Sequence, residues 1–275
     1  MEARPVVNLA ILNGFVEDPK NETSCSDYVP KDDAHFWKSY FSNLTRPSGK
    51  SKYEVTEIMG REISNRYALI INPFWETCVD YSFEQREVYN LIRSYIRDGG
   101  IFVNTSGFSF FFTWSVKLGK KMPISEMKQF IPAQMKIKCE PFTESQLREK
   151  FFFTGTSYYR DFGALTTFDT KPGWDPVPVK AFQTDEDIRR FGDLLGADTE
   201  ITEFRSLREG TPNCIPLVRA KREEFGEIYP IAALKHGWGY LLVAGMGMKE
   251  SNKECELFAK STDKFCGWVS SRLLR

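Results

Sequence analysis

The stretch FEQREVYNLIRSYIRDGG, residues 83–100, followed by IFVNTSG, residues 101–107, decides the fold class. Its first part carries a single apolar stripe at the three- and four-residue spacing of a helix. The members of this stripe are Val88, Leu91, Ile92, Tyr95 and Ile96. Its second part begins with a short apolar run that is partly β-branched, as in a strand covered on both faces. The stretch therefore predicts a helix, a stop and a buried strand.

The two ends of this helix have sequence signals of their own. Ser82, with Gln85 three residues later, matches the capping box that starts many helices. Gly99 and Gly100 offer the left-handed exit that a helix C-terminus often needs. The strand then runs into the polar turn at residues 104–107. Because ligands bind at the carboxyl ends of strands in open α/β sheets, we expect a site at this edge.

The segments before this stretch predict more of the same sheet. Apolar or alternating runs predict strands at residues 6–12, 53–58 and 67–71. Asp32 and Asp33 can cap a helix between the first two strands. The apolar side of that helix consists of Phe36, Trp37, Tyr40, Phe41 and Leu44. Parallel neighbours need crossover connections, so this order of elements predicts a parallel sheet.

The second half of the chain completes the predicted architecture. Strand-like runs at 217–220, 228–234 and 240–244 are separated by glycine turns and predict antiparallel strands. A helical repeat of apolar residues over 255–273 predicts an amphipathic helix on the core. The fold class is therefore an α/β three-layer sandwich, with a mostly parallel sheet and antiparallel strands late in the chain.

Residues 108–178 break the regular pattern. Phenylalanine-rich runs, basic stretches and proline- and glycine-rich pieces replace clear periodicity there. We expect one domain over residues 1–275, with 108–178 as an insertion or elaborated subdomain. Apolar patches of this kind mark association sites, so a homo-oligomer or a protein partner is expected through this phenylalanine-rich region.

Composition limits the classes of function. The chain has 275 residues, of which 41% are hydrophobic, which is enough for a buried core. Its 37 basic and 37 acidic residues cancel, which disfavours nucleic acid as a partner. No apolar run approaches the roughly 20 residues of a membrane span, so we expect no membrane partner and a cytoplasmic protein. Six cysteines without paired spacing favour free thiols in a reducing compartment.

Four quoted segments carry a resemblance to a known fold family. They are YALIINP (67–73), YIRDGG (95–100), IFVNTSG (101–107) and YPIAALKHGWGYLLVAG (229–245). The order of these pieces resembles the class I glutamine amidotransferase-like fold, a flavodoxin-like sandwich shared with ThuA-like and DJ-1/PfpI-like proteins. In that superfold, the segment after the paired glycines and one strand is the nucleophile elbow.

This chain departs from the catalytic pattern of the family. The resemblance implies a Gly-x-Cys-x-Gly elbow and a His-x-Glu pair, because a thiolate nucleophile needs an imidazole and a carboxylate that orients it. Here the elbow is Asn104-Thr-Ser-Gly, and Gly237 and Trp238 follow His236. We therefore predict a non-catalytic small-ligand-binding or regulatory domain.

The alternative is a hydrolase of amides or esters. Ser106 would be its nucleophile at the strand-to-helix turn, and His236 would be its general base. Glu76 or Asp80 would supply the acid. Each residue also has a structural interpretation: Ser106 as a helix cap and His236 as a hairpin-turn residue. The other histidine, His35, lies beside Phe36 and Trp37 and is predicted to be structural.

The preferred candidate is a ligand site where several strands end. Its predicted residues are Asn13, Gly14, Asn72, Trp75, Asn104, Thr105 and Gly107. They could line one pocket for a small polar molecule, with Trp75 as an aromatic wall. The alternative is that strand ends are generally rich in Asn, Gly and Pro. Two distant histidines and unpaired cysteines predict no metal, and the incomplete glycine motif Gly245-Met-Gly247 predicts no dinucleotide cofactor.

Overall fold

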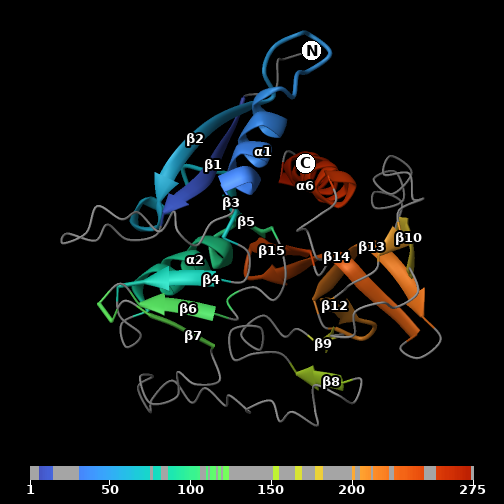
Figure 1. Ribbon diagram of the computed structural model, residues 1–275. Helices are drawn as coiled ribbons and strands as arrows, with labels where there is room; N and C mark the ends of the chain where they lie inside the picture. Colours follow the sequence, from blue (N-terminus) through green and yellow to red (C-terminus); the bar gives the residue numbers. More distant parts are fainter. Residues whose placement is uncertain are drawn as a thin grey trace.

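The computed structural model describes part of the chain (Figure 1). The described ranges are 6–14, 31–74, 77–81, 86–105, 110, 112–115, 117–118, 120–123, 151–154, 165–168, 177–181, 200–201, 205–211, 213–222, 226–244 and 252–273.

Five neighbouring strands form a parallel block in the main sheet. In spatial order they are β15 (Gly239–Ala244), β5 (Ile101–Asn104), β3 (Leu69–Asn72), β1 (Val7–Gly14) and β2 (Tyr53–Met59). Each adjacent pair is parallel. The strands predicted at 6–12, 53–58, 67–71, 101–103 and 240–244 are therefore confirmed, with ends shifted by a few residues.

The rest of the main sheet is antiparallel. Beyond β15 the order continues with β14 (Gly226–His236), β13 (Cys214–Arg222), β10 (Val177–Ala181) and β11 (Glu200–Ile201). The branch from β14 consists of β12 (Arg205–Arg208), β9 (Leu165–Phe168) and β8 (Phe151–Thr154). The prediction of antiparallel strands late in the chain is confirmed.

A second, three-stranded sheet consists of β4 (Thr77–Asp80), β6 (Phe112–Ser115) and β7 (Lys120–Pro123). The described strands of the region 108–178 thus divide between the two sheets. Its role as an insertion and its role in association stay predictions, because most of this region lies outside the described residues.

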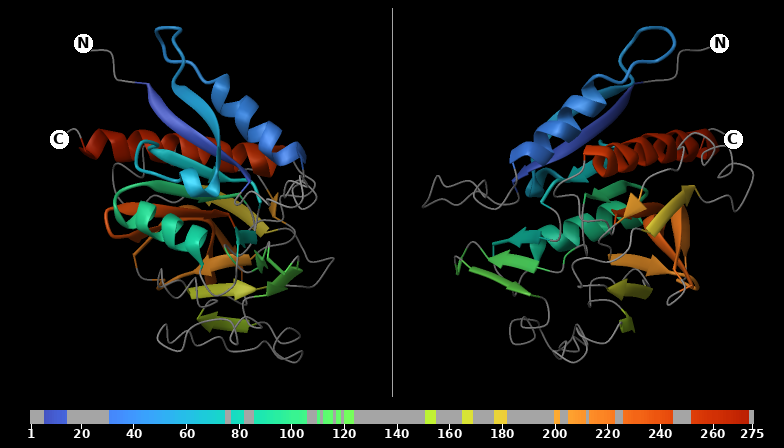
Figure 2. Two further views of the ribbon diagram at one scale, coloured as in Figure 1. Left: turned by 90° about the vertical axis from the view of Figure 1, so that its left-hand side faces the viewer. Right: turned by 45° about the vertical axis from the view of Figure 1, so that its right-hand side comes forward.

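Helices cover both faces of the parallel block (Figures 1 and 2). One face carries α1 (Lys31–Ser42) and α6 (Asn252–Leu273), and the other carries α2 (Glu87–Arg97). A short 3₁₀ turn, η2 (Gly60–Glu62), follows β2. This arrangement is the predicted three-layer α/β sandwich.

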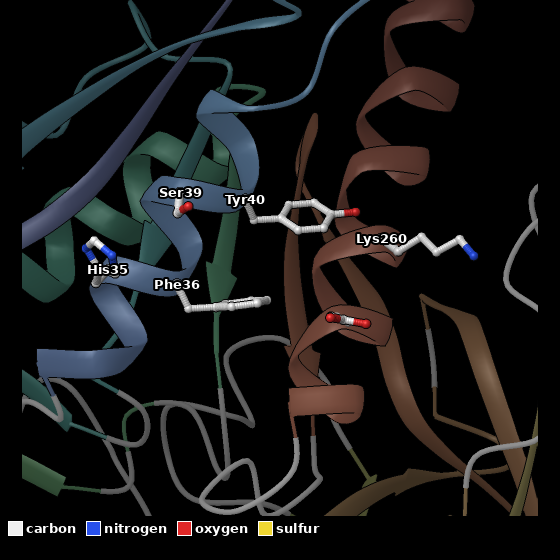
Figure 3. A pocket seen from close by; sticks show the side chains of 6 residues that line it. His35, Phe36, Ser39, Tyr40 and Lys260 are labelled. Atoms are coloured by element: carbon white, nitrogen blue, oxygen red, sulfur yellow. The ribbon is translucent and has the colours of Figure 1, made fainter.

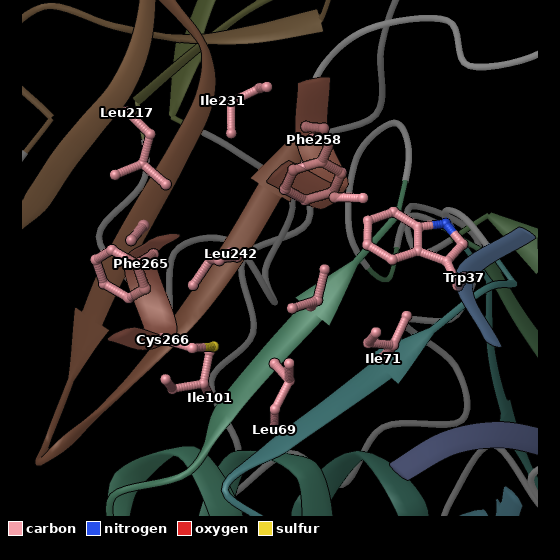
Figure 4. Close-up of a cluster of buried hydrophobic side chains, with 14 of the residues drawn as sticks. Trp37, Leu69, Ile71, Ile101, Leu217, Ile231, Leu242, Phe258, Phe265 and Cys266 are labelled. Carbon is pink, nitrogen blue, oxygen red and sulfur yellow. The ribbon is translucent and has the colours of Figure 1, made fainter. Parts of the chain in front are cut away.

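The core lies between the sheet and the pair α1 and α6 (Figure 4). Alternate residues of the parallel strands face this side, because successive side chains of a strand point to opposite faces. They include Leu9, Ile11, Leu69, Ile71, Ile101 and Val103, all nearly or fully buried. From the helices, Trp37 meets Phe258 edge-to-face with ring centroids 5.4 Å apart. Phe102, on the opposite face, packs against Phe110 beside α2.

One polar contact ties α6 to the edge strand β2. Asp263 Oδ1 accepts hydrogen bonds from Lys52 Nζ at 2.5 Å and from Tyr53 Oη at 2.7 Å. The carboxylate and the Tyr53 hydroxyl are buried in the layer between sheet and helix. The contact therefore fixes the position of α6 along the sheet.

The C-terminus of α2 follows the prediction, whereas its N-terminus does not. Gly99, with φ of +113°, donates its N–H to Ile96, and Gly100 donates to Tyr95, which is a Schellman motif. Gly100 itself has an ordinary φ, and its missing Cβ instead leaves room for the Tyr95 ring. The helix begins at Glu87, later than the sequence predicts, and Ser82 and Gln85 lie outside the described residues.

Candidate functional site

Three strands that are predicted to end at a ligand site, β1, β3 and β5, end at one edge of the parallel block. In the pairing of β3 with β5, Asn72 lies opposite Asn104, and Ile71 is level with Ile11 of β1. Asn13 therefore lies just beyond the level of Asn72. Because all three strands run parallel, their carboxyl ends share one edge, which we call the carboxyl edge. The shared edge follows from the parallel pairing of these strands, and a common ligand pocket there stays a prediction.

Asn72 and Asn104 join the ends of β3 and β5. Both side chains are fully buried, and Asn72 Nδ2 donates to Asn104 Oδ1 at 2.8 Å. Asn72 Oδ1 accepts the backbone N–H of Phe74 at 3.0 Å. A buried amide that is hydrogen-bonded in this way positions the chain that follows. Their structural role is therefore established by geometry, and their contact with a ligand stays a prediction.

Thr105 directly follows β5 at the carboxyl edge. Its backbone N–H donates to the carbonyl of Asn72 at 3.2 Å. Its side chain is 1% exposed, and its hydroxyl oxygen has no hydrogen-bond partner. A buried hydroxyl without a partner is uncommon, because it loses its bonds to water and gains none in return. Among the described predicted ligand residues, Thr105 is thus the one with a buried side-chain polar atom that has no hydrogen-bond partner.

The structure describes only some of the other predicted ligand residues. Asn13 is exposed, and Gly14 pairs with Met59 of β2 after an irregularity in β1. Trp75, Glu76, Ser106 and Gly107 lie outside the described residues.

His236 lies at the opposite edge of the sheet. It pairs with Gly239 at the hairpin, and Tyr240 in turn pairs with Ile101, the first residue of β5. Thr105, the residue before Ser106, follows the other end of β5. A strand advances about 3.3 Å per residue, so the length of β5 separates these positions. The strand register therefore keeps His236 away from the carboxyl edge. Ser106 lies outside the described residues, so its pairing with His236 stays a prediction.

Asp80, one of the two candidate acids, has a different role. Its Oδ1 accepts the backbone N–H of Val88 at 2.7 Å, and its Oδ2 accepts that of Tyr89 at 3.4 Å. A strand residue thus caps the N-terminus of α2. Burial raises the pKa of Asp80 to about 7, and this effect outweighs the lowering by the two backbone N–H groups and by the Arg86 guanidinium. Sequence analysis missed this cap because β4 carries no strand signal.

The described cysteines are free thiols, as the sequence predicts: Cys78, Cys214, Cys255 and Cys266. Burial raises the pKa of Cys78 and of Cys266 well above the ordinary value, and it raises the pKa of Cys214 to about 12. The thiolate is the reactive form, so these three side chains are poor nucleophiles at neutral pH. In the described ranges, no three His, Cys, Asp or Glu side chains converge as metal ligands do.

A cavity between α1 and α6 was not predicted from the sequence (Figure 3). It has a volume of about 520 Å³ and is lined by His35, Phe36, Ser39, Tyr40, Glu256 and Lys260. His35 is exposed on this surface, and its structural role stays a prediction. The signal for the cavity is the spacing of Phe36 and Tyr40, one helical turn apart.

Comparisons with known proteins support the fold. No protein-family model and no curated protein sequence matches the chain. A β-galactosidase from Bacillus circulans sp. alkalophilus is structurally similar, with a TM-score of 0.51 and 10% sequence identity, over 94% of this chain and 30% of that chain. This chain thus spans less than a third of that protein, and the similarity concerns the fold alone.

Two proteins described as ThuA-like are similar over most of both chains. The one from Bacteroides uniformis has a TM-score of 0.47 and 11% identity, over 98% of this chain and 94% of its own. The one from Parabacteroides merdae has a TM-score of 0.43 and 9% identity, over 96% of this chain and 91% of its own.

Within the described residues, no helix is both long enough and apolar enough to span a membrane.

Proposed function

We propose that this chain is a non-catalytic domain of amidotransferase-like architecture that binds a small polar ligand at the carboxyl edge. The observation that carries the proposal is the Thr105 hydroxyl, which is buried at this edge and has no hydrogen-bond partner. A ligand hydroxyl, amide or carbonyl would satisfy it, since a threonine hydroxyl both donates and accepts.

The surroundings of Thr105 favour a neutral ligand over an anion. A helix N-terminus usually attracts phosphate or carboxylate groups, because its first N–H groups point outward. At α2 the N–H groups of Val88 and Tyr89 are already bonded to the Asp80 carboxylate. The ligand class that fits is therefore a neutral molecule with hydroxyl or amide groups.

Two observations support a role without catalysis. The buried thiols have raised pKa values, so Cys78, Cys214 and Cys266 do not offer a thiolate. His236 lies at the opposite edge from Thr105. The sequence Asn104-Thr-Ser-Gly, which has no cysteine, supports the same proposal.

Substitution of Thr105 by valine tests the ligand site. Valine keeps the shape of the side chain and removes the hydroxyl, so the unliganded protein is expected to gain stability by about 1 kcal/mol, because an unpaired buried group is lost. A panel of neutral sugars, nucleosides and amides would be screened by thermal shift. A compound that raises the melting temperature of the wild type, but not of Thr105→Val, identifies the ligand class.

The matched control is Thr105→Ser, which keeps the hydroxyl and is expected to keep the ligand response. The proposal is wrong if compounds shift Thr105→Val as strongly as the wild type. It is also wrong if no member of a broad panel of this class shifts either protein.

The hydrolase alternative makes a separate prediction at Ser106. A serine activated by a general base reacts with fluorophosphonate probes, because these trap the nucleophilic oxygen. Since His236 does not reach the carboxyl edge, we expect no labelling of the wild type above that of Ser106→Ala, measured by intact-protein mass spectrometry. Stoichiometric labelling that disappears in Ser106→Ala would establish the enzyme instead.

A further inference from the structure

The cavity between α1 and α6 is separate from the carboxyl-edge site. It lies on the outer side of the two helices that cover the core, and Figure 3 shows it from close by. The lining residues of α1 are two adjacent pairs one helical turn apart, His35 with Phe36 and Ser39 with Tyr40. Glu256 and Lys260 are one turn apart on α6. The cavity is therefore built by the packing of two long helices, not by a loop.

Two aromatic rings form its α1 side. Phe36 and Tyr40 have ring centroids 6.0 Å apart and ring planes inclined by 32°. Figure 3 shows both rings projecting from α1 toward α6. Trp37 and Phe41 on the same helix are fully buried and stack with centroids 6.0 Å apart, so α1 is held firmly beneath the cavity. The two rings thus present fixed faces to a ligand.

Two carboxylates act on the Tyr40 side chain. Burial, together with the nearby carboxylates of Asp263 and Glu256, raises the pKa of Tyr40 to about 12. Asp263 is paired with Lys52, whereas Glu256 is exposed on the cavity wall. Lys260 also lines the cavity, but its ammonium group points away from α1 in Figure 3. Among the lining residues, Glu256 is therefore the carboxylate that also acts on the Tyr40 side chain.

We infer that this cavity binds a small organic cation of the alkylammonium class. The faces of Phe36 and Tyr40 attract a cation through their ring quadrupoles, and the Glu256 carboxylate supplies the opposite charge. A neutral molecule of the same shape would contact the rings without gaining either term. The cavity volume of about 520 Å³ is ample for such a group.

Choline and its neutral carbon analogue 3,3-dimethylbutan-1-ol provide the direct test. They have the same shape and differ in the charge of one central atom. Each would be titrated into the full chain, with chemical shifts of ¹³C-labelled Phe and Tyr rings as the readout. Saturable shifts of Phe36 and Tyr40 with choline, and none with the alcohol, are expected. Equal shifts with both compounds, or none with choline, would overturn the inference.

Four variants assign the binding to this cavity. Tyr40→Leu is expected to weaken choline binding on the order of fivefold, and Glu256→Gln to a similar extent, since each removes one attraction. Tyr40→Phe keeps the ring and should bind as the wild type. Lys260→Gln is the matched charge control on the same helix, and its binding should be unchanged or tighter. If Lys260→Gln weakens binding as much as Glu256→Gln, the assignment of charge is wrong.

A vesicle experiment identifies the source of the cation. The same choline group occurs free in solution and as the head of phosphatidylcholine. Co-sedimentation with phosphatidylcholine vesicles that is lost in Glu256→Gln would assign the cavity to the lipid headgroup. Absence of co-sedimentation, together with the choline shifts, would assign the cavity to a free alkylammonium compound.

Discussion

Replacement of Gly239 by alanine is expected to destabilise the fold by at least about 3 kcal/mol. Gly239 is the first residue of β15 and is buried against the C-terminus of α2. A Cβ at this position would lie against the backbone carbonyl oxygens of Gly100 and Ile96. These oxygens already accept the N–H groups of Tyr240 and Gly99, so neither can move without breaking a bond.

The measurement is urea unfolding followed by circular dichroism, with soluble yield as a second readout. Gly267→Ala is the matched control, because Gly267 lies inside α6 and its added Cβ meets nothing within 4 Å. Alanine in a helix interior is better than glycine by about 0.5–1 kcal/mol, so this variant should be slightly more stable than the wild type. A Gly239→Ala protein with wild-type stability would contradict the close packing of the hairpin on α2.

Loss of the Asp80 side chain is expected to produce the second large effect. Asp80→Ala leaves the buried N–H groups of Val88 and Tyr89 without their acceptor, at a cost of about 2–4 kcal/mol. Glu87→Gln, an exposed change in the first turn of the same helix, should cost little. Urea unfolding of the two variants distinguishes a specific cap from a general charge effect. Equal losses in the free energy of unfolding for both variants would exclude Asp80 as a specific cap.

The same carboxyl group predicts a pH dependence of stability. Its pKa is about 7 in the fold and near 3.8 in the unfolded chain, so the folded protein binds more protons between these values. The stabilisation that comes from the raised pKa of Asp80 is fully present below the pKa of the unfolded chain. It is lost as the pH rises through the pKa of the folded protein, and the free energy of unfolding falls by roughly 1–3 kcal/mol. Asp80→Asn cannot titrate and keeps one acceptor oxygen. Its unfolding free energy should change less than that of the wild type between about pH 5 and pH 8.

The parallel block could be predicted from the sequence because its signals are local. Each strand is a short apolar or alternating run followed by Asn, Gly or Pro, or ending in one of them, as at Asn72 and Asn104. The stop of α2 was also predictable, since Gly99 adopts the positive φ that glycine favours. These features depend on neighbours within a few residues, which a pattern can express.

The start of α2 and the place of His236 depend on contacts between distant segments. The helix is capped by Asp80, a residue of a strand in the other sheet, so its first turn has no signal of its own. The position of His236 follows from the direction of the strands. A hairpin that leads into the last parallel strand must turn at the edge opposite the carboxyl edge. The sequence indicates this turn through Gly237 and Trp238. It does not indicate the hydrogen bond between the buried side chains of Asn72 and Asn104, because that contact depends on the register of β3 and β5.

The position of α6 late in the sequence affects how the chain folds during translation. The strands β1, β3 and β5 leave the ribosome early, yet the helix that covers their apolar face, with Phe258 and Phe265 at its centre, belongs to residues 252–273. Contacts of such long sequence separation form slowly, because a large loop must close first. Until α6 has been translated, the side chains of Leu69 and Ile101 are partly exposed to solvent. A chaperone would protect this partly folded nascent chain from aggregation.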